Sequence, residues 1–276
     1  MAHEQQTPDE NQGESPNREE LAEGTLMSHL LELRDRLMKG MLALLVVFIP
    51  CAIFANDLYS FIAQPLLDKL PKGTTLIATG VVTPFMTPFK LAFYVSIFFA
   101  MPVLLYQIWA FVAPGLYKRE KRFAVPLLVS SVVLFYAGVV FAYFVVFPVM
   151  FSYLVGTAPA GVSYMPDIAA YLDFALTMFF AFGVAFEVPV AVVLLVLTGL
   201  VKVESLGNNR GYVIIGIFVV AAILTPPDAI SQTIMALPMW LLYEGGLVMA
   251  RLMQKMRREE AEKARKEEDE EEAEAS

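Results

Sequence analysis

Two carboxylates in this chain lie where an apolar sequence should carry no charge. Glu187 and Asp173 fall within residues 169–200, a stretch that is otherwise dominated by apolar side chains. A carboxylate at the centre of a bilayer costs about 2.5–3.5 kcal/mol on insertion scales unless it is protonated, paired or hydrated. In a straight helix the two groups would share one face, about 21 Å apart. This pattern favours a hydrated concavity or a functional carboxyl, and a protonated Glu187 bonded to a neighbouring helix is the alternative.

Two further carboxylates lie close to basic residues. Glu32 belongs to residues 25–39, where leucines recur at helical spacing and predict an amphipathic helix that leads into an apolar segment. Arg36 follows Glu32 at i, i+4, so the two could form an ordinary surface pair worth a few tenths of a kcal/mol. Glu120 follows Lys118 and Arg119 and could simply balance their charge. The residues alone favour these simpler interpretations for both carboxylates.

The residue types that most enzyme sites need are scarce. Cys51 is the single cysteine, and His3 and His29 are the two histidines. A cysteine and histidine set that could hold a metal is therefore not available. The sequence contains neither a G-x-x-x-x-G-K-[ST] phosphate-binding motif nor a recognisable Ser/His/Asp set. We therefore predict that the protein is not an enzyme and that it needs no cofactor.

Long apolar segments must position these carboxylates. Hydrophobic residues make up 57% of the 276 residues, and the mean hydropathy is +0.59. A hydrocarbon core of about 30 Å needs about 20 helical residues. The sequence predicts an all-α polytopic membrane protein with six spans, of which the fifth is short: about 37–55, 85–112, 123–148, 169–200, 212–224 and 230–248. Pro189 should kink the fourth span just beyond Glu187.

Lysine and arginine predict the orientation of the spans. Basic residues are concentrated before the first span, after the sixth, and in the connections between the second and third and between the fourth and fifth. The positive-inside rule then places both termini in the cytoplasm. We predict a disordered cytoplasmic tail over residues 1–24, a membrane domain over 25–250 and a charged tail over 251–276. The end of that last tail, residues 259–276, is either a solvated helix extension or a disordered acidic segment.

A polar turn separates the last two predicted spans. Thr225 and Gln232 flank Pro226, Pro227 and Asp228. These residues could close a tight turn at the outer interface. A short span with hydrogen-bonding groups is also a plausible docking face for another transmembrane helix.

Several strings in this chain resemble the TatC family of the twin-arginine protein translocase, and the match runs from about residue 25 to 250. They are HLLELR from His29, FAND from Phe54, QPL from Gln64, IAT from Ile77, YQIWAFVAPGLY from Tyr106, FAYF from Phe141, FGVAFEVP from Phe182 and LTPPD from Leu224.

The resemblance implies a function and a place in the cell. TatC proteins sit in the bacterial cytoplasmic (inner) membrane, bind signal peptides that carry two adjacent arginines, and act with the single-span subunits TatA and TatB. Together these move folded proteins across the membrane, driven by the proton motive force. Neither P-loop chemistry nor a cofactor is implied.

The resemblance also implies roles for individual residues. Glu32 and Glu120 would receive the arginine pair, which suits two carboxylates because each can bind a planar guanidinium through two hydrogen bonds. Arg34, Phe111 and Pro65 would belong to the same signal-peptide site. Glu187 would form the polar wall of a concave, cupped six-helix structure, and the partner-helix contact would use Thr225, Gln232 and Asp228.

A proton-coupled small-solute carrier is the alternative function. It would use Glu187 as its protonation site and would explain Asp173. It leaves the amphipathic segment around Glu32 without a role.

Overall fold

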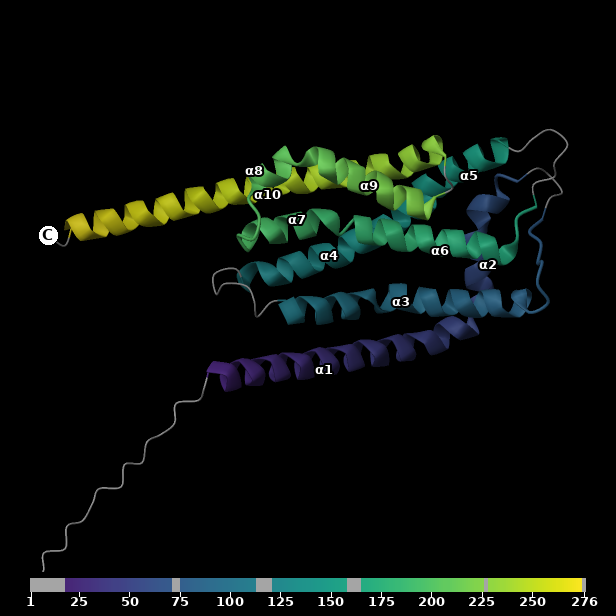
Figure 1. Ribbon diagram of the computed structural model, residues 1–276, viewed down its shortest axis with the longest axis horizontal. Coiled ribbons are helices and arrows are strands. Elements are labelled where there is room, and N and C mark those ends of the chain that lie inside the picture. Colours follow the sequence, from purple (N-terminus) through teal and green to yellow (C-terminus); the bar gives the residue numbers. More distant parts are fainter. Residues whose placement is uncertain (1–17, 71–74, 113–120, 158–164, 226–227, 275–276) are drawn as a thin grey trace, which may run out of the picture.

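The computed structural model describes residues 18–70, 75–112, 121–157, 165–225 and 228–274, and nearly all of them are helical (Figure 1). The elements in chain order are α1 (Arg18–Ile53), α2 (Ala55–Leu67), α3 (Thr83–Val112), α4 (Lys121–Phe141), the π-helix η2 (Ala142–Val146), α5 (Phe147–Gly156), α6 (Ile168–Ala185), α7 (Val188–Leu197), α8 (Val203–Asn208), α9 (Arg210–Leu224) and α10 (Ala229–Glu274). Within these ranges, β-type pairing is limited to one isolated bridge between Ile77 and Asp167.

The helices confirm the predicted all-α polytopic fold. Among the described residues, five helices are long and apolar enough to cross a membrane: Leu30–Ile53, Thr83–Phe111, Val125–Gly156, Ile168–Leu197 and Ala229–Met256. The third of these runs on to Gly156 because η2 and α5 continue α4 without a loop. The predicted short span is α9, whose 15 residues are only about 22 Å long.

The long helices lie side by side along one axis, and the two ends of the bundle differ (Figure 1). The start of α1 and the end of α10 project from one end, which we call the tail end. At the opposite cap end α2 lies across the bundle and packs on α3, α5 and α6. The bridge joins the two connections of this end, with Ile77 N donating to Pro166 O at 3.1 Å and Ile168 N donating to Ile77 O at 2.9 Å.

The first and last helices run into the two predicted tails. Helix α1 begins at Arg18, so it includes residues 18–24 of the predicted N-terminal tail. Arg, Glu, Leu and Ala prevail there, and such residues extend an existing helix without the cost of a new nucleus. Helix α10 continues to Glu274, so it includes most of the predicted charged tail. Residues 1–17 lie outside the described ranges.

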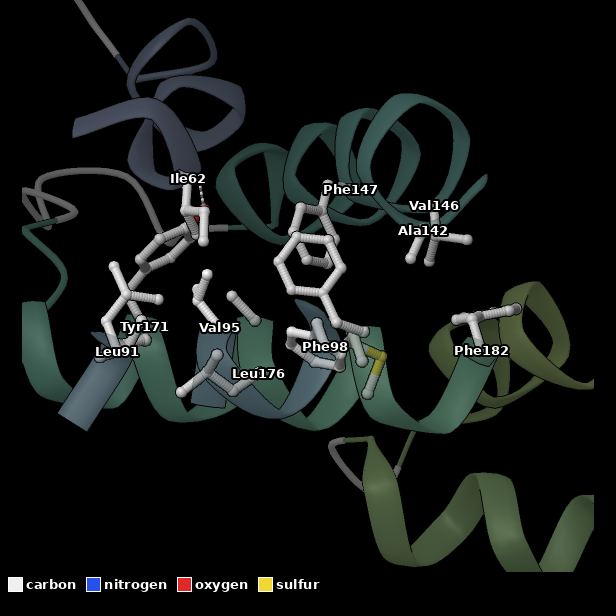
Figure 2. Close-up of a cluster of buried hydrophobic side chains, with 14 of the residues drawn as sticks. Ile62, Leu91, Val95, Phe98, Ala142, Val146, Phe147, Tyr171, Leu176 and Phe182 are labelled. Carbon is white, nitrogen blue, oxygen red and sulfur yellow. Dashed lines mark hydrogen bonds between the residues drawn. The ribbon is translucent and has the colours of Figure 1, made fainter. Parts of the chain in front are cut away.

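The main core lies where α2, α3, α6 and the α4–η2–α5 segment meet. Figure 2 shows Phe98, Phe147 and Leu176 converging there from three different elements. The phenol of Tyr171 in α6 donates a hydrogen bond of 2.6 Å to the carbonyl of Ile62 in α2, so the cap helix is tied to the bundle through a buried polar contact (Figure 2).

Glycines allow two helix pairs to approach closely. A Cβ added at Gly138 in α4 would lie 2.4 Å from the carbonyl oxygen of Phe182 in α6, and one at Gly183 would lie 2.5 Å from the ring of Phe135. Further along the same span, a Cβ at Gly246 in α10 would lie 2.8 Å from Pro189 Cα in α7. Small residues at such crossings are the usual basis of helix association in lipid.

The Gly138 contact can be tested by adding one methyl group. Gly138→Ala should destabilise the protein by about 1–3 kcal/mol, because the new Cβ meets backbone that cannot move aside easily. Gly245→Ala is the matched control, since an added Cβ there meets nothing within 4 Å. Thermal unfolding in one detergent measures both variants, and equal midpoints would show that the α4–α6 crossing tolerates the extra volume.

Candidate functional site

Glu187 lies at a break in the fourth span. Helix α6 ends at Ala185 and α7 begins at Val188, with Pro189 in the first turn of α7. Glu187 N donates to Val184 O at 3.0 Å, and Ala191 N donates to Glu187 O at 2.9 Å, so the backbone stays hydrogen-bonded on both sides of the break. The interruption predicted from Pro189 is present, and it fixes where the Glu187 side chain points.

The Glu187 carboxylate faces the interior of the bundle. It interacts with the hydroxyl of Ser131 in α4, and Ser131 also accepts a 3.2 Å hydrogen bond from Trp109 Nε1 in α3. The other Glu187 oxygen, Oε1, is buried and has no hydrogen-bond partner among the described residues. Three spans therefore contribute to one intramembrane polar cluster, composed of Glu187, Ser131 and Trp109.

Asp173 has different surroundings from Glu187. It lines a groove of about 1,100 Å³ between α3, α6, α9 and α10, and its Oδ1 lies 2.5 Å from Lys90 Nζ in α3. Ala185 and Val188 line the same groove, whereas Glu187 between them does not. The expectation that both carboxylates share one face assumed a straight helix, and the break at Phe186–Glu187 removes that condition. The groove wall is consequently almost entirely apolar.

Glu32 lies near the tail end of the bundle. Helices α1 and α3 pack together in opposite directions, with Gly40 facing Leu104. Glu32 precedes Gly40 by about two turns, and α3 ends about two turns after Leu104, so Glu32 is level with the end of α3. Arg36 donates to Glu32 Oε1 through Nε at 3.0 Å and also through Nη2. The predicted i, i+4 pair is therefore present.

The other residues predicted for the signal-peptide site are distributed between both ends. Arg34 is exposed and pairs with Asp35 at 2.9 Å, and Phe111 is half-buried near the end of α3. Glu120 lies outside the described residues, between Val112 and Lys121, which are both at the tail end. Pro65 is buried in α2 at the cap end, so it is separated from Glu32 by the length of a span.

The predicted partner-contact residues surround the turn between α9 and α10. Thr225 is buried, and its hydroxyl donates to Ala221 O at 2.8 Å. Asp228 caps α10 by accepting from Ser231 N at 2.8 Å and Ile230 N at 3.1 Å. The backbone N–H of Ser231 is the main group that lowers the pKa of Asp228. Gln232 is half-buried in the first turn of α10.

Asp167 is an important polar residue that our sequence analysis missed. It accepts hydrogen bonds from Thr79 N at 2.9 Å and Thr79 Oγ1 at 2.8 Å, and from Ala169 N and Ala170 N at the start of α6. These bonds, led by that from the Thr79 backbone, lower the pKa of Asp167 to about 2. An Asp before an apolar run is a recognisable helix-capping signal, but its distant partner Thr79 left no local signal.

The low pKa of Asp167 predicts how the cap end responds to acid. A carboxylate with an unfolded pKa near 3.9 and a native pKa of about 2 contributes stability that is complete above about pH 4 and is lost as the pH falls through 2. Asp167→Asn should lower the unfolding temperature at neutral pH, and its difference from wild type should shrink between about pH 4 and pH 2. Asp57→Asn, in the first turn of α2, controls for losing a charge at this end. If the difference in unfolding temperature between Asp167→Asn and wild type stayed constant down to pH 2, the ionised Asp167 would not stabilise the cap end.

The fold and the site together define a polytopic helical membrane protein with intramembrane polar groups. No group of three or more metal-ligating side chains occurs in the described part of the chain. A family model for the Sec-independent protein translocase protein (TatC) matches residues 28–238. The chain belongs to the TatC family, whose members are translocase components and not enzymes, and it is accordingly a multi-pass protein of the bacterial inner membrane.

Similar proteins and solved structures support this assignment. The TatC protein of Azotobacter chroococcum mcd 1 is 58% identical over 222 residues, covering 80% of this chain and 87% of the relative. That of Escherichia coli strain K12 is 54% identical over 226 residues, covering 82% and 88%. A crystal structure described as the twin arginine translocase receptor TatC is 36% identical with a TM-score of 0.73, covering 81% of this chain and 98% of the other.

Proposed function

We propose that this chain is the receptor subunit of a twin-arginine translocase. It binds twin-arginine signal peptides on the cytoplasmic side, and with TatA and TatB it moves folded proteins across the membrane, driven by the proton motive force. Family membership and the likeness to a solved structure described as a receptor support this proposal. The observation that carries it is the environment of Glu32.

Glu32 has the chemistry that an arginine receptor needs. Its side chain is 36% exposed, and its Oε1 already accepts two N–H groups of the Arg36 guanidinium. The carboxylate thus stands in a place that accommodates a planar guanidinium, and an incoming arginine can exchange with Arg36 for it. Glu120, which lies outside the described residues, would supply the second carboxylate. Two such carboxylates can distinguish an arginine pair from a lysine pair, because a lysine ammonium lacks the planar set of paired donors that a guanidinium presents.

The partner subunits would contact the polar turn and the apolar surface of α9. Ile215, Tyr212 and Ile223 on this helix are each more than 60% exposed. An apolar surface gains nothing by itself from leaving lipid, so association depends on shape and on hydrogen bonds. Thr225, Asp228 and Gln232 place such polar groups beside the exposed helix, where single-span TatA and TatB could dock.

The carboxylates can be tested with paired peptides. Glu32→Gln and Glu120→Gln should each weaken binding of an arginine-pair signal peptide about ten- to hundredfold, because a hydrogen bond to a charged group is worth about 1.5–3 kcal/mol. A lysine-pair peptide should bind weakly to every form. Asp35→Asn, which removes an exposed neighbouring carboxylate, is the control, and a pull-down in mild detergent gives the readout. If a variant that carries both Glu32→Gln and Glu120→Gln bound the arginine-pair peptide as tightly as wild type does, the receptor proposal would fail.

Glu187 separates the receptor from the solute-carrier alternative. Glu187→Gln keeps the hydrogen-bonding shape but removes the titrating group, so a carrier that protonates Glu187 should stop completely. We expect only a partial loss of export from an assembled translocase, since Glu187 contacts Ser131 and is not part of the groove wall. Export of a folded reporter in cells is the measurement. Proton-coupled solute uptake in vesicles that disappears in Glu187→Gln would favour the carrier.

A further inference from the structure

The groove between α3, α6, α9 and α10 ends in a pair of opposite charges. Its wall is apolar along Val188, Val220 and Leu224, while Lys90 and Asp173 line one end. The side chains of this pair are 47% and 53% exposed, so both remain accessible from outside. A lysine ammonium has three donors and a carboxylate two acceptor oxygens. The 2.5 Å contact between Lys90 Nζ and Asp173 Oδ1 uses one donor and one acceptor oxygen. The remaining donors of the ammonium and the second carboxylate oxygen can bind a ligand.

The depth of the ion pair matches the headgroup boundary of a bilayer. The 29 residues Thr83–Phe111 are about 44 Å long, which equals a bilayer with its headgroup regions of about 40–45 Å. Lys90 lies about 10 Å from the start of this helix, and Asp173 lies about 8 Å from the start of α6. Both therefore stand close to where headgroups meet a hydrocarbon core of about 30 Å.

The apolar part of the groove has the dimensions of lipid chains. From Asp173 to Val188 the wall runs about 22 Å along α6 and α7, more than the half-thickness of about 15 Å that one leaflet contributes. The groove volume of about 1,100 Å³ exceeds the range of about 300–1,000 Å³ that is usual for small-molecule pockets, as a site for a larger ligand should. On α9 the wall includes Gly216, where an added Cβ would meet nothing within 4 Å, so the groove is open there.

We propose that this groove is a binding site for a zwitterionic aminophospholipid, with its phosphate on Lys90, its primary ammonium on Asp173 and its acyl chains along α6 and α9. The charges of the headgroup and of the protein are complementary. The lipid carries a negative phosphate and a positive ammonium a few atoms apart, and the protein offers a positive lysine and a negative carboxylate side by side. An anionic headgroup would be repelled by Asp173. The quaternary ammonium of phosphatidylcholine has no N–H to donate to the carboxylate.

The test titrates the delipidated full chain with phosphatidylethanolamine, phosphatidylcholine and phosphatidylglycerol, and counts bound lipid by native mass spectrometry. Wild type should bind phosphatidylethanolamine about tenfold more tightly than the other two. Asp173→Asn should remove that preference, and Lys90→Gln should weaken binding of all three lipids. Lys69→Gln, at an exposed lysine of the cap end, should change nothing.

The acyl-chain half of the site has its own variants. Gly216→Phe should fill the groove and abolish binding while both charges remain, and Val220→Phe should do the same from the next turn of α9. Gly211→Phe is the matched control, because Gly211 is also open within 4 Å but does not line the groove. Unfolding temperatures check that each variant is folded.

Three results would overturn the proposal. One is binding of phosphatidylethanolamine that is unchanged in both groove-filling variants. Another is tighter binding of phosphatidylglycerol than of phosphatidylethanolamine, which would indicate attraction to lysine alone. The third is a single-span protein that crosslinks to a cysteine introduced at Thr177 and excludes the lipid, which would show that a partner helix occupies the groove. The receptor proposal is independent of all these outcomes, since its test uses Glu32 and Glu120.

Discussion

Helices in a bilayer gain no hydrophobic energy by leaving lipid for each other, so this bundle depends on how closely its backbones can approach. The contacts of Gly138 with Phe182 and of Gly183 with Phe135 bring α4 against α6. Gly246 brings α10 against Pro189. These three contacts lie before and after the break at Phe186–Glu187, so the same packing that holds the helices together also sets the direction of the Glu187 side chain. Because Glu187 points into the bundle, the polar cluster of Glu187, Ser131 and Trp109 is separate from the apolar groove that Asp173 lines.

The features that the sequence predicted correctly are those with local causes. Apolar runs of about twenty residues predicted the spans, and Pro189 predicted the break, because a proline acts on its own turn of helix. A polar composition such as that of residues 18–24 is compatible with disorder and with helix, because Arg, Glu, Leu and Ala also favour helix, and α1 begins at Arg18. The π-helix at Ala142–Val146 lies inside the predicted third span of about 123–148, where hydropathy gives no signal for a π-helix, and α5 carries the span on to Gly156.

The features that the sequence could not predict join distant residues. Lys90 and Asp173 are 83 positions apart, and Thr79 and Asp167 are 88 apart. Each charge looked isolated in the sequence, and only the packing of α3 on α6 and the cap bridge supply the partners. For the proposed arginine-pair site, helical periodicity predicted the setting of Glu32, whereas the roles of Glu120 and Pro65 came from the resemblance to a family and not from residue chemistry.

The length of α10 has a mechanical consequence. Its 46 residues form one helix of about 69 Å, which begins at the Asp228 cap and passes the tail end without a loop. Pro238 is its one internal point of weakened backbone bonding. Because the helix is unbroken, the Asp228 cap beside α9 and the charged segment beyond the tail end belong to one continuous element, and the position of one constrains the position of the other.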